Sequence, residues 1–317
     1  MEQVHSFVVA DQVSITVGPT KSLLGKISGD SAAETSVLRR VSFSLAAGDH
    51  VTLFGGVGAG KSTLLRVLVG ALAPSDGTVL VNGQDPRQAS NLAAGYISSE
   101  ESEPQGQTAY QVLHAFGVTH GLTHLPSRIG EIAEAVGIGT VMHRPSALLS
   151  TAERLRLNVA RAILSDTPLV LLDDVADQLG TAEVADLLTG PLAGRTVIVA
   201  TRQVRIAEEL DLPILLLHES TLVQRGTRDE IASAVSAERV LDVWVEGLRY
   251  DLLRTLRKHP GVSSVRLMPT TDFNGQKLRI VLKSSHYLPS LYDTVSQAPL
   301  VKVEELPPSL QDIISRL

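Results

Sequence analysis

The chain has 317 residues, enough for a core of ordinary size and more consistent with two domains than with one. Its 44% hydrophobic and 20% charged residues are typical of a globular protein, and the net charge of −6 argues against a dedicated nucleic-acid surface, which usually carries a basic excess. The sequence contains no cysteine, which excludes disulfides, thiolate metal sites and thiol nucleophiles.

Strand and helix patterns alternate over residues 1–238. The first part holds a strand-rich segment at 6–17, a polar loop at 18–36, strands at 37–45 and 50–54, a helix at 63–72, and a strand at 78–81 ending in the hairpin signal Asn82-Gly83. Residues 105–165 are mainly helical, and continuous apolar strands follow at 168–172, 195–200 and 213–217. This alternation predicts an α/β domain whose parallel sheet is covered on both faces.

A different pattern begins near residue 239. Strands at 241–245, 262–267, 277–282 and 300–304 alternate with helices at 248–258 and 288–296 in the order β-α-β-β-α-β. This order is the split arrangement of a ferredoxin-like unit, and a closing helix is predicted at 309–317. We therefore expect two domains: an α/β domain at 1–238 and a small C-terminal α+β domain at 239–317.

The segment after the predicted strand at 50–54 has the spacing G-x-x-x-x-G-K-[ST]. Glycines in such a loop let consecutive backbone N–H groups turn toward phosphate oxygens, and the following helix directs its positive N-terminus at them. Lys61 would reach the β- and γ-phosphates, and the hydroxyl of Ser62 would ligate Mg²⁺. The loop is predicted to bind a nucleoside triphosphate through Gly55, Gly58, Gly60, Lys61, Ser62 and Thr63.

A carboxylate, Asp173, ends the apolar strand predicted at 168–172. Ligands of parallel sheets bind at the carboxyl ends of the strands, which is where this residue is expected. A P-loop usually has such an acidic partner on a neighbouring strand. Ser62 and Asp173 are therefore the candidate magnesium ligands.

The order of elements over residues 6 to about 235 resembles the ATP-binding subunit of an ABC transporter. Besides the P-loop and Asp173, the lead-in strands at 37–48, the hairpin at 75–83 and the sequence Leu149-Ser150-Thr151-Ala152-Glu153, at the place of the family's LSGGQ signature, carry this resemblance. It implies a P-loop NTPase fold with an antiparallel β lead-in and a helical subdomain. It also implies ATP and Mg²⁺ as ligands. In that family two subunits pair head to tail, so Ser150 would face the ATP of the partner.

Six residues, at five places in the family pattern, are altered. Asp174 stands in place of the catalytic Glu, which keeps a carboxylate but shortens it by one methylene and makes it a weak candidate for the general base. Arg202 stands where the family has the switch His that contacts the γ-phosphate; it keeps a positive charge but cannot accept a hydrogen bond. The remaining changes are Ser99 for a Gln, Thr151 and Ala152 for the two signature glycines, and Gly180 for an Asp.

These alterations, together with an intact P-loop, are consistent with two hypotheses about activity. In one, the chain holds ATP but hydrolyses it poorly, as the degenerate half of a pair whose partner is more competent. In the other, it is a slow but real ATPase with Asp174 as its base. An alternative from another class is a non-hydrolysing, nucleotide-gated scaffold or regulatory subunit.

The resemblance also implies partners and a location. It implies a second ATP-binding subunit, with a different chain favoured over a second copy, and an integral membrane permease. A soluble ABC ATPase that acts on nucleic acid is disfavoured by the acidic balance and by the absence of a second nucleotide domain, so no nucleic-acid partner is expected. The tail resembles the C-terminal extension of some ABC export ATPases, which favours export. Because neither a secretory signal nor an apolar run of roughly 20 residues is present, we expect a soluble, cytoplasmic chain held at the inner face of the membrane through the permease.

Overall fold

The computed structural model describes residues 6–18, 35–88, 94–98, 106–235, 239–248, 250–269, 276–306, 310 and 313. The chain divides into two compact units, Met1–Arg225 and Gly226–Leu317. Each is described by itself below, and the functional division expected at residue 238 stays a prediction. Within the described residues, no helix combines the length and apolar character needed to cross a bilayer.

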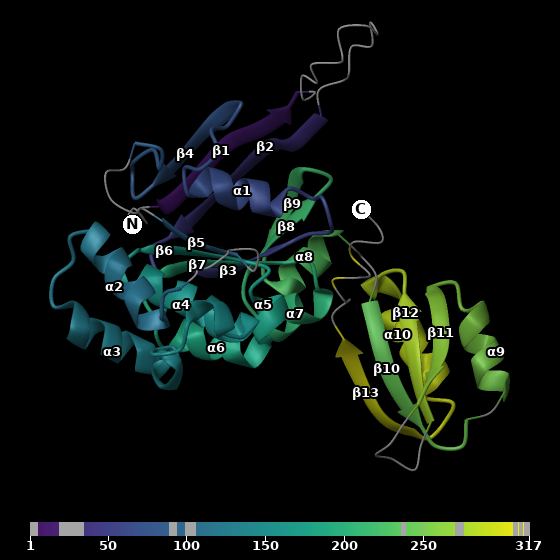
Figure 1. Cartoon of the computed structure of the whole chain (residues 1–317). Coiled ribbons are helices and arrows are strands. Elements are labelled where there is room, and N and C mark those ends of the chain that lie inside the picture. The colour runs from purple at the N-terminus through teal and green to yellow at the C-terminus, as the bar shows by residue number, and fades with distance from the viewer. Residues whose placement is uncertain are drawn as a thin grey trace, which may run out of the picture. The chain divides into compact units, whose positions relative to one another are not determined.

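The first unit is built on a six-stranded sheet in the order β5-β6-β7-β3-β8-β9 and a three-stranded sheet in the order β2-β1-β4 (Figure 1). Its strands are β1 Ser6–Val17, β2 Thr35–Ala46, β3 His50–Phe54, β4 Asp76–Val81, β5 Ala94–Ser98, β6 Leu169–Asp173, β7 Thr196–Thr201, β8 Ile214–His218 and β9 Thr221–Gly226. Its α-helices are α1 Lys61–Leu68, α2 Ala109–Thr119, α3 Leu125–Ala135, α4 Thr151–Leu164, α5 Ala176–Leu179, α6 Thr181–Thr189 and α7 Val204–Glu209.

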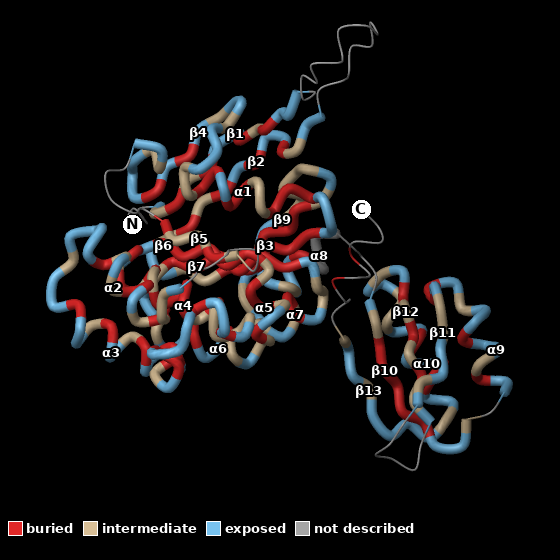
Figure 2. Tube along the Cα trace, viewed as in Figure 1, coloured by how far each residue is buried: buried red, intermediate tan, exposed pale blue. Residues whose placement is uncertain are grey.

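The central strands of the larger sheet are parallel, as their continuous apolar sequences predict. β3 pairs in parallel with β7 and β8, and β6 does so with β5 and β7. Every residue of β6 and β7 is buried, which Figure 2 shows as red strands. Strands covered on both faces read as unbroken apolar runs because neither side of the pleat meets water.

The two faces of this sheet are covered differently. Alternate residues of β6, Leu169 and Leu171, join a core with α1 and the three-stranded sheet, whose strands pair antiparallel. Val170 and Leu172 instead join a core with α2, α3, α4 and α6. The antiparallel lead-in and the helical region of the expected fold are thus both present, on opposite faces of the sheet.

Several boundaries differ from those predicted. β2 begins at Thr35, inside the loop predicted at 18–36, and residues 19–34 of that loop lie outside the described part. Helix α1 begins at Lys61 rather than at residue 63, because the glycine before it adopts the left-handed conformation that lets the helix start at once. The predicted Asn82-Gly83 turn is confirmed: both residues have positive φ, at 50° and 75°, and Val81 and Gln84 exchange two backbone hydrogen bonds across it.

The second unit contains helix α8 Arg228–Val235 followed by a four-stranded sheet with two helices. Its elements run β10 Arg239–Val245, α9 Tyr250–Lys258, β11 Val262–Met268, β12 Gln276–Leu282, α10 Leu288–Val295 and β13 Leu300–Leu306. The sheet order is β11-β12-β10-β13 and all its pairs are antiparallel. The predicted β-α-β-β-α-β order is therefore confirmed, whereas the closing helix at 309–317 lies outside the described residues except for Leu310 and Ile313.

One face of this second sheet is apolar, and the other carries a buried charged residue. Leu241, Val243 and Val245 of β10 pack in the core with α9 and α10. The alternating residues Asp242 and Trp244 are on the other face, because side chains of a strand alternate between faces. There the Asp242 side chain is 1% exposed and pairs with two cations of β12, Lys277 and Arg279.

Candidate functional site

The loop between β3 and α1 has, at two glycines, a backbone conformation that other residues rarely adopt. Gly58 and Gly60 have φ values of 76° and 101°. A Cβ on Gly60 would lie 2.6 Å from a methyl carbon of Leu38 and 2.7 Å from the carbonyl oxygen of Val37. The loop can therefore wrap closely around the start of α1, whose first N–H groups have no acceptor within the helix. Such N–H groups, at the positive end of the helix dipole, suit an anion.

Lys61, the first residue of α1, is 8% exposed and lies over this loop. Its Nζ donates hydrogen bonds to the carbonyl oxygens of Gly55, at 2.8 Å, and Gly56, at 3.0 Å. Burial lowers the pKa of the ammonium, while the nearby carboxylates of Asp174 and Asp173 oppose that effect. A largely desolvated cation is thus held at the loop, next to two carboxylates. Ser62 and Thr63 follow it on α1 and are half-buried.

Asp173 ends β6 and is 5% exposed. Its Oδ2 accepts a hydrogen bond of 2.7 Å from the hydroxyl of Tyr96 on the neighbouring strand β5. Burial and the bond to this carboxylate raise the pKa of the tyrosine to about 12. Its Oδ1 is buried and makes no hydrogen bond, so the carboxylate has one oxygen left for another ligand.

Asp174, the next residue, has a left-handed backbone with φ of 53°, which aspartate tolerates better than most residues. Its backbone N–H donates to the carbonyl of Ala200 at 3.1 Å, which ties it to the end of β7. Its Oδ1 is also buried without a hydrogen bond. Burial, with the charges of Asp177 and Asp173, raises the pKa of this carboxyl group, which makes it a stronger base.

The buried oxygens of Asp173 and Asp174 fit a magnesium ion. Mg²⁺ prefers oxygen ligands and is usually bound by one or two carboxylates together with phosphates of a nucleotide. Within the part of the chain that the structure describes, no group of three His, Cys, Asp or Glu is arranged to hold a metal by itself. Such a site would therefore be completed by the nucleotide and the Ser62 hydroxyl.

Arg202 follows β7 and is 57% exposed; its Nε lies 3.9 Å from Oδ2 of Asp177. Asp177 belongs to the short helix α5, is 7% exposed, and accepts a hydrogen bond of 2.8 Å from the hydroxyl of Thr201. Asp177 is not among the site residues predicted from the sequence. Asp177 follows Asp173 by four residues. That spacing would place the two side chains on one face only within a helix, and the residues between them leave a strand and turn before α5 begins.

The start of α4, at the place of the signature, is capped by its own side chains. Ser150 Oγ accepts from the backbone N–H of Glu153 at 3.2 Å, and Glu153 Oε2 accepts from that of Ser150 at 2.7 Å. Arg144 donates to the other oxygen of Glu153 at 3.0 Å. This reciprocal pattern is a capping box, readable from the spacing of Ser and Glu, which the sequence analysis did not use.

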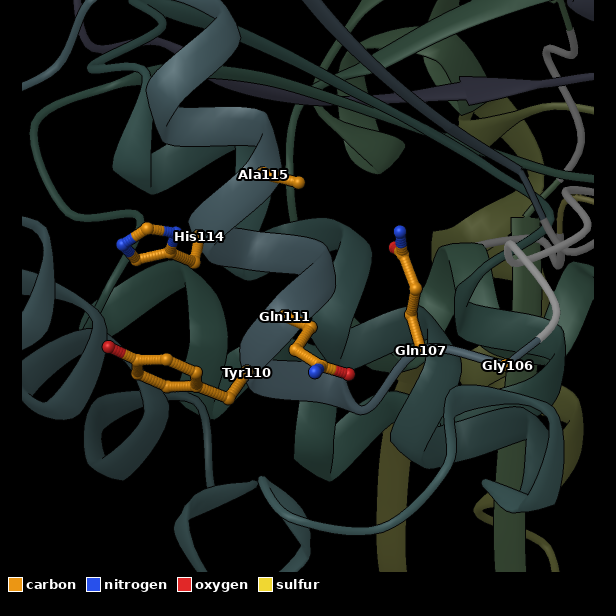
Figure 3. Close-up of a pocket in the computed structure, with 6 residues that line it drawn as sticks. All are labelled: Gly106, Gln107, Tyr110, Gln111, His114 and Ala115. Carbon is orange, nitrogen blue, oxygen red and sulfur yellow. The ribbon is translucent and has the colours of Figure 1, made fainter.

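The structure thus gathers most predicted residues at the carboxyl edge of the six-stranded sheet: the P-loop, Asp173, Asp174 and Arg202. The start of α4 instead holds the signature positions Ser150, Thr151 and Ala152. Gly180, with φ of 91°, joins α5 to α6. Ser99 lies outside the described residues. A concavity on α2 contains none of these residues; Figure 3 shows its lining, Gly106, Gln107, Tyr110, Gln111, His114 and Ala115.

The sequence is similar to those of known proteins. The sequence model of the family described as ABC transporter matches residues 38–177. The ATP-dependent lipid A-core flippase of Burkholderia orbicola is 32% identical over 214 residues, which cover 63% of this chain but only 36% of the flippase. The cytochrome c biogenesis ATP-binding export protein CcmA of Mesorhizobium japonicum is 30% identical over 191 residues, covering 59% of this chain and 94% of CcmA. The match to this chain thus spans less than half of the length of several relatives, the flippase among them.

Solved structures share the fold. A cbiO1 structure from Clostridium perfringens, part of the cbiONQ complex, has a TM-score of 0.57 at 18% identity and covers 72% of this chain and 91% of its own. The dimeric MJ0796 bacterial ABC transporter cassette has a TM-score of 0.57 at 17% identity and covers 69% and 98%. Taken with the CcmA match across nearly its whole length, these findings show that the chain belongs to the family of ABC transporter ATP-binding domains.

Proposed function

We propose that this chain binds ATP with Mg²⁺ at the loop before α1 and couples that binding to an integral membrane permease. The observation that carries the proposal is the buried Lys61, whose Nζ donates to two loop carbonyls. It lies beside two carboxylates whose buried Oδ1 atoms have no hydrogen-bond partner among the described residues. Phosphate oxygens would replace those carbonyls as acceptors for Nζ. The remaining contacts to phosphates would come from the backbone of Gly55, Gly58, Gly60 and Thr63, with Ser62 and Asp173 on the magnesium ion.

For hydrolysis, Asp174 is the group that can take a proton from water. Its raised pKa suits a base, but its side chain is one methylene shorter than the Glu of the family, and its reach is reduced accordingly. Arg202 can neutralise charge on a phosphate but cannot accept a hydrogen bond. We therefore expect slow turnover or none in the isolated chain.

That expectation is tested by steady-state phosphate release from the purified full chain. Wild type should bind Mg-ATP saturably yet release phosphate slowly, and Asp174→Ala should remove whatever release remains. Asp186→Asn, which neutralises an exposed carboxylate on α6, serves as the control and should behave as wild type. Vigorous release that Asp174→Ala abolishes would contradict the degenerate-site proposal.

We further propose that the chain is the degenerate half of a pair. At the start of α4, the carboxylate of Glu153 accepts from the backbone N–H of Ser150, the residue that would face the γ-phosphate of a partner's ATP. Like charges repel, so the site between this helix and a partner's P-loop should be weakened. A different chain with an intact signature is therefore the favoured partner. The dimeric cassette and the cbiONQ complex, named for two structures of the same fold, support pairing and a place beside a permease at the inner membrane face.

Export is the direction we favour, and the CcmA relative is an ATP-binding export protein. The methionine import protein MetN of Desulfitobacterium hafniense is also related, at 26% identity over 77% of each chain. Transport into or out of vesicles carrying the native complex separates the two directions.

A non-hydrolysing, nucleotide-gated scaffold is the second candidate, favoured by the changed Asp174 and Arg202. Isolation of the native complex decides between them. Recovery of a membrane permease with this chain supports transport, and its consistent absence supports the scaffold.

A further inference from the structure

Asp177 is a buried carboxylate whose two oxygens have unequal partners. Its side chain is 7% exposed, and Oδ1 accepts a hydrogen bond of 2.8 Å from the hydroxyl of Thr201, which is itself fully buried. Oδ2 is buried and has no hydrogen-bond partner among the residues that the structure describes. Burying a charge is unfavourable unless a counter-charge is near. Arg202 supplies one within ion-pair distance, and the charge of Lys61 also interacts with this carboxylate.

The guanidinium of Arg202 approaches Oδ2 through its Nε, at 3.9 Å. This contact uses the side of the guanidinium nearest the backbone, so the two terminal nitrogens remain farther from the carboxylate. The side chain is 57% exposed, which leaves room for those nitrogens to reach a ligand. Arginine suits this double role because its donors form a rigid planar fork.

Arg202 also lies close enough to the P-loop to act on it. The pKa of Lys61 is lowered mainly by burial and, in smaller part, by the positive charge of Arg202. The same charge acts on the carboxyl group of Asp174. The charges of Asp177 and Arg202 therefore act on both Lys61 and Asp174, beside the proposed phosphate site.

We infer that Asp177 is a positioning residue: its carboxylate, oriented by Thr201, holds the Nε side of Arg202, so that the terminal N–H groups of Arg202 meet the γ-phosphate. The chain thereby discriminates ATP from ADP. The inference rests on the proposed binding of nucleotide at Lys61. ADP lacks the γ-phosphate, so it gains nothing from a positioned Arg202. The preference for ATP over ADP is therefore the quantity on which Asp177 acts.

The direction in which ATP affinity changes when Asp177 is neutralised distinguishes a positioning role from a purely electrostatic one. Asp177 is negative and lies near a polyanion, so removing its charge alone would strengthen ATP binding. If Asp177 instead positions Arg202, its removal weakens ATP binding although a repulsive charge has been taken away. A role in folding alone would change the affinities for ATP and ADP equally.

The test is the equilibrium affinity of the full chain for Mg-ATP and Mg-ADP, measured by displacement of a fluorescent nucleotide at low temperature. Wild type should prefer ATP, and Arg202→Ala should reduce that preference about 10-fold, the size of one lost charge-assisted contact. Asp177→Asn should reduce it by a similar factor with ADP affinity unchanged. The double variant should lose no more than Arg202→Ala, because the two residues act as one unit. Asp186→Asn is the matched carboxylate control and should keep the wild-type preference.

Thr201→Val provides a second variant should Asp177→Asn fold poorly, as thermal unfolding would show. It removes the hydroxyl that orients the carboxylate and should lower the ATP preference in the same direction but less. Tighter ATP binding by Asp177→Asn, or additive losses in the double variant, would overturn the inference. Wild-type binding of ATP and ADP with equal affinity would overturn it while leaving the proposed function intact. Failure of wild type to bind either nucleotide would overturn both.

Discussion

Lys61→Ala should lower the affinity of the chain for Mg-ATP by about 100-fold or more, which corresponds to about 2.7 kcal/mol. Lys61 is 8% exposed, and its ammonium donates to the Gly55 and Gly56 carbonyls of the loop. Its charge is therefore poorly screened by water, and an interaction with phosphate there is worth more than one at the surface. Calorimetric titration of the full chain with Mg-ATP measures the loss.

The control for this prediction is Arg87→Ala, which removes a cation of the same unit that pairs with Asp85 at the surface. It should leave ATP affinity within about twofold, since exposed ion pairs contribute little. Thermal unfolding of both variants shows whether the loop stays folded without the lysine. ATP binding by Lys61→Ala at nearly wild-type strength would show that the nucleotide does not use this loop.

Asp242→Asn should destabilise the second unit by about 2–3 kcal/mol, because it removes a buried negative charge that pairs with two cations. The carboxylate accepts from Arg279 at 2.8 and 2.9 Å and pairs with Lys277 at 2.8 Å, while it is itself 1% exposed. Trp244, two residues further along β10, lies beneath the Nζ of Lys277, 4.6 Å from the ring centroid. Loss of the carboxylate should therefore disturb the ion pairs and the cation–π contact together.

The measurement is urea or thermal unfolding of the full chain followed by tryptophan fluorescence. Trp244 is the single tryptophan of the sequence and lies in the second unit, so the signal reports on that unit. Glu304→Gln is the matched control, since Glu304 pairs with Lys302 at 2.9 Å but is 46% exposed. It should change stability by less than about 1 kcal/mol. Equal effects of the two variants would refute the special role of the buried carboxylate.

The stabilisation by Asp242 should also depend on pH. Burial raises the pKa of the carboxyl group, but the hydrogen bonds and charges of Arg279 and Lys277 outweigh burial and hold it below its ordinary value. A group whose pKa is lower in the folded state contributes fully above its unfolded pKa of about 3.9 and loses that contribution as pH falls through the folded value. The stability difference between wild type and Asp242→Asn should thus be constant near neutral pH and shrink below about pH 4.

Local sequence patterns were sufficient for much of the fold. The spacing of Gly55, Gly60 and Lys61 predicts the loop and the helix after it, since glycine conformation and helix N-termini are local properties. Unbroken apolar runs predict β6 and β7 because burial on both faces shows in each strand separately. The order of elements in the second unit was predicted for the same reason. By contrast, β5 and β9 were not predicted as strands, as β5 contains a glycine and β9 has no buried residue.

The sequence by itself determined that a phosphate-binding loop, a carboxylate at the end of a buried strand and a separate C-terminal sheet exist in this chain. Only the tertiary structure decided which side chains meet: Tyr96 bonds to Asp173 across 77 residues, and Thr201 bonds to Asp177 across 24. These contacts depend on strand order, which places β5 beside β6 and β6 beside β7, and on the turn that returns α5 to the end of β7. Strand order results from the packing of the whole unit and has no signature in a window of a few residues. Asp177 therefore enters the candidate site only when the folded sheet brings it to Arg202.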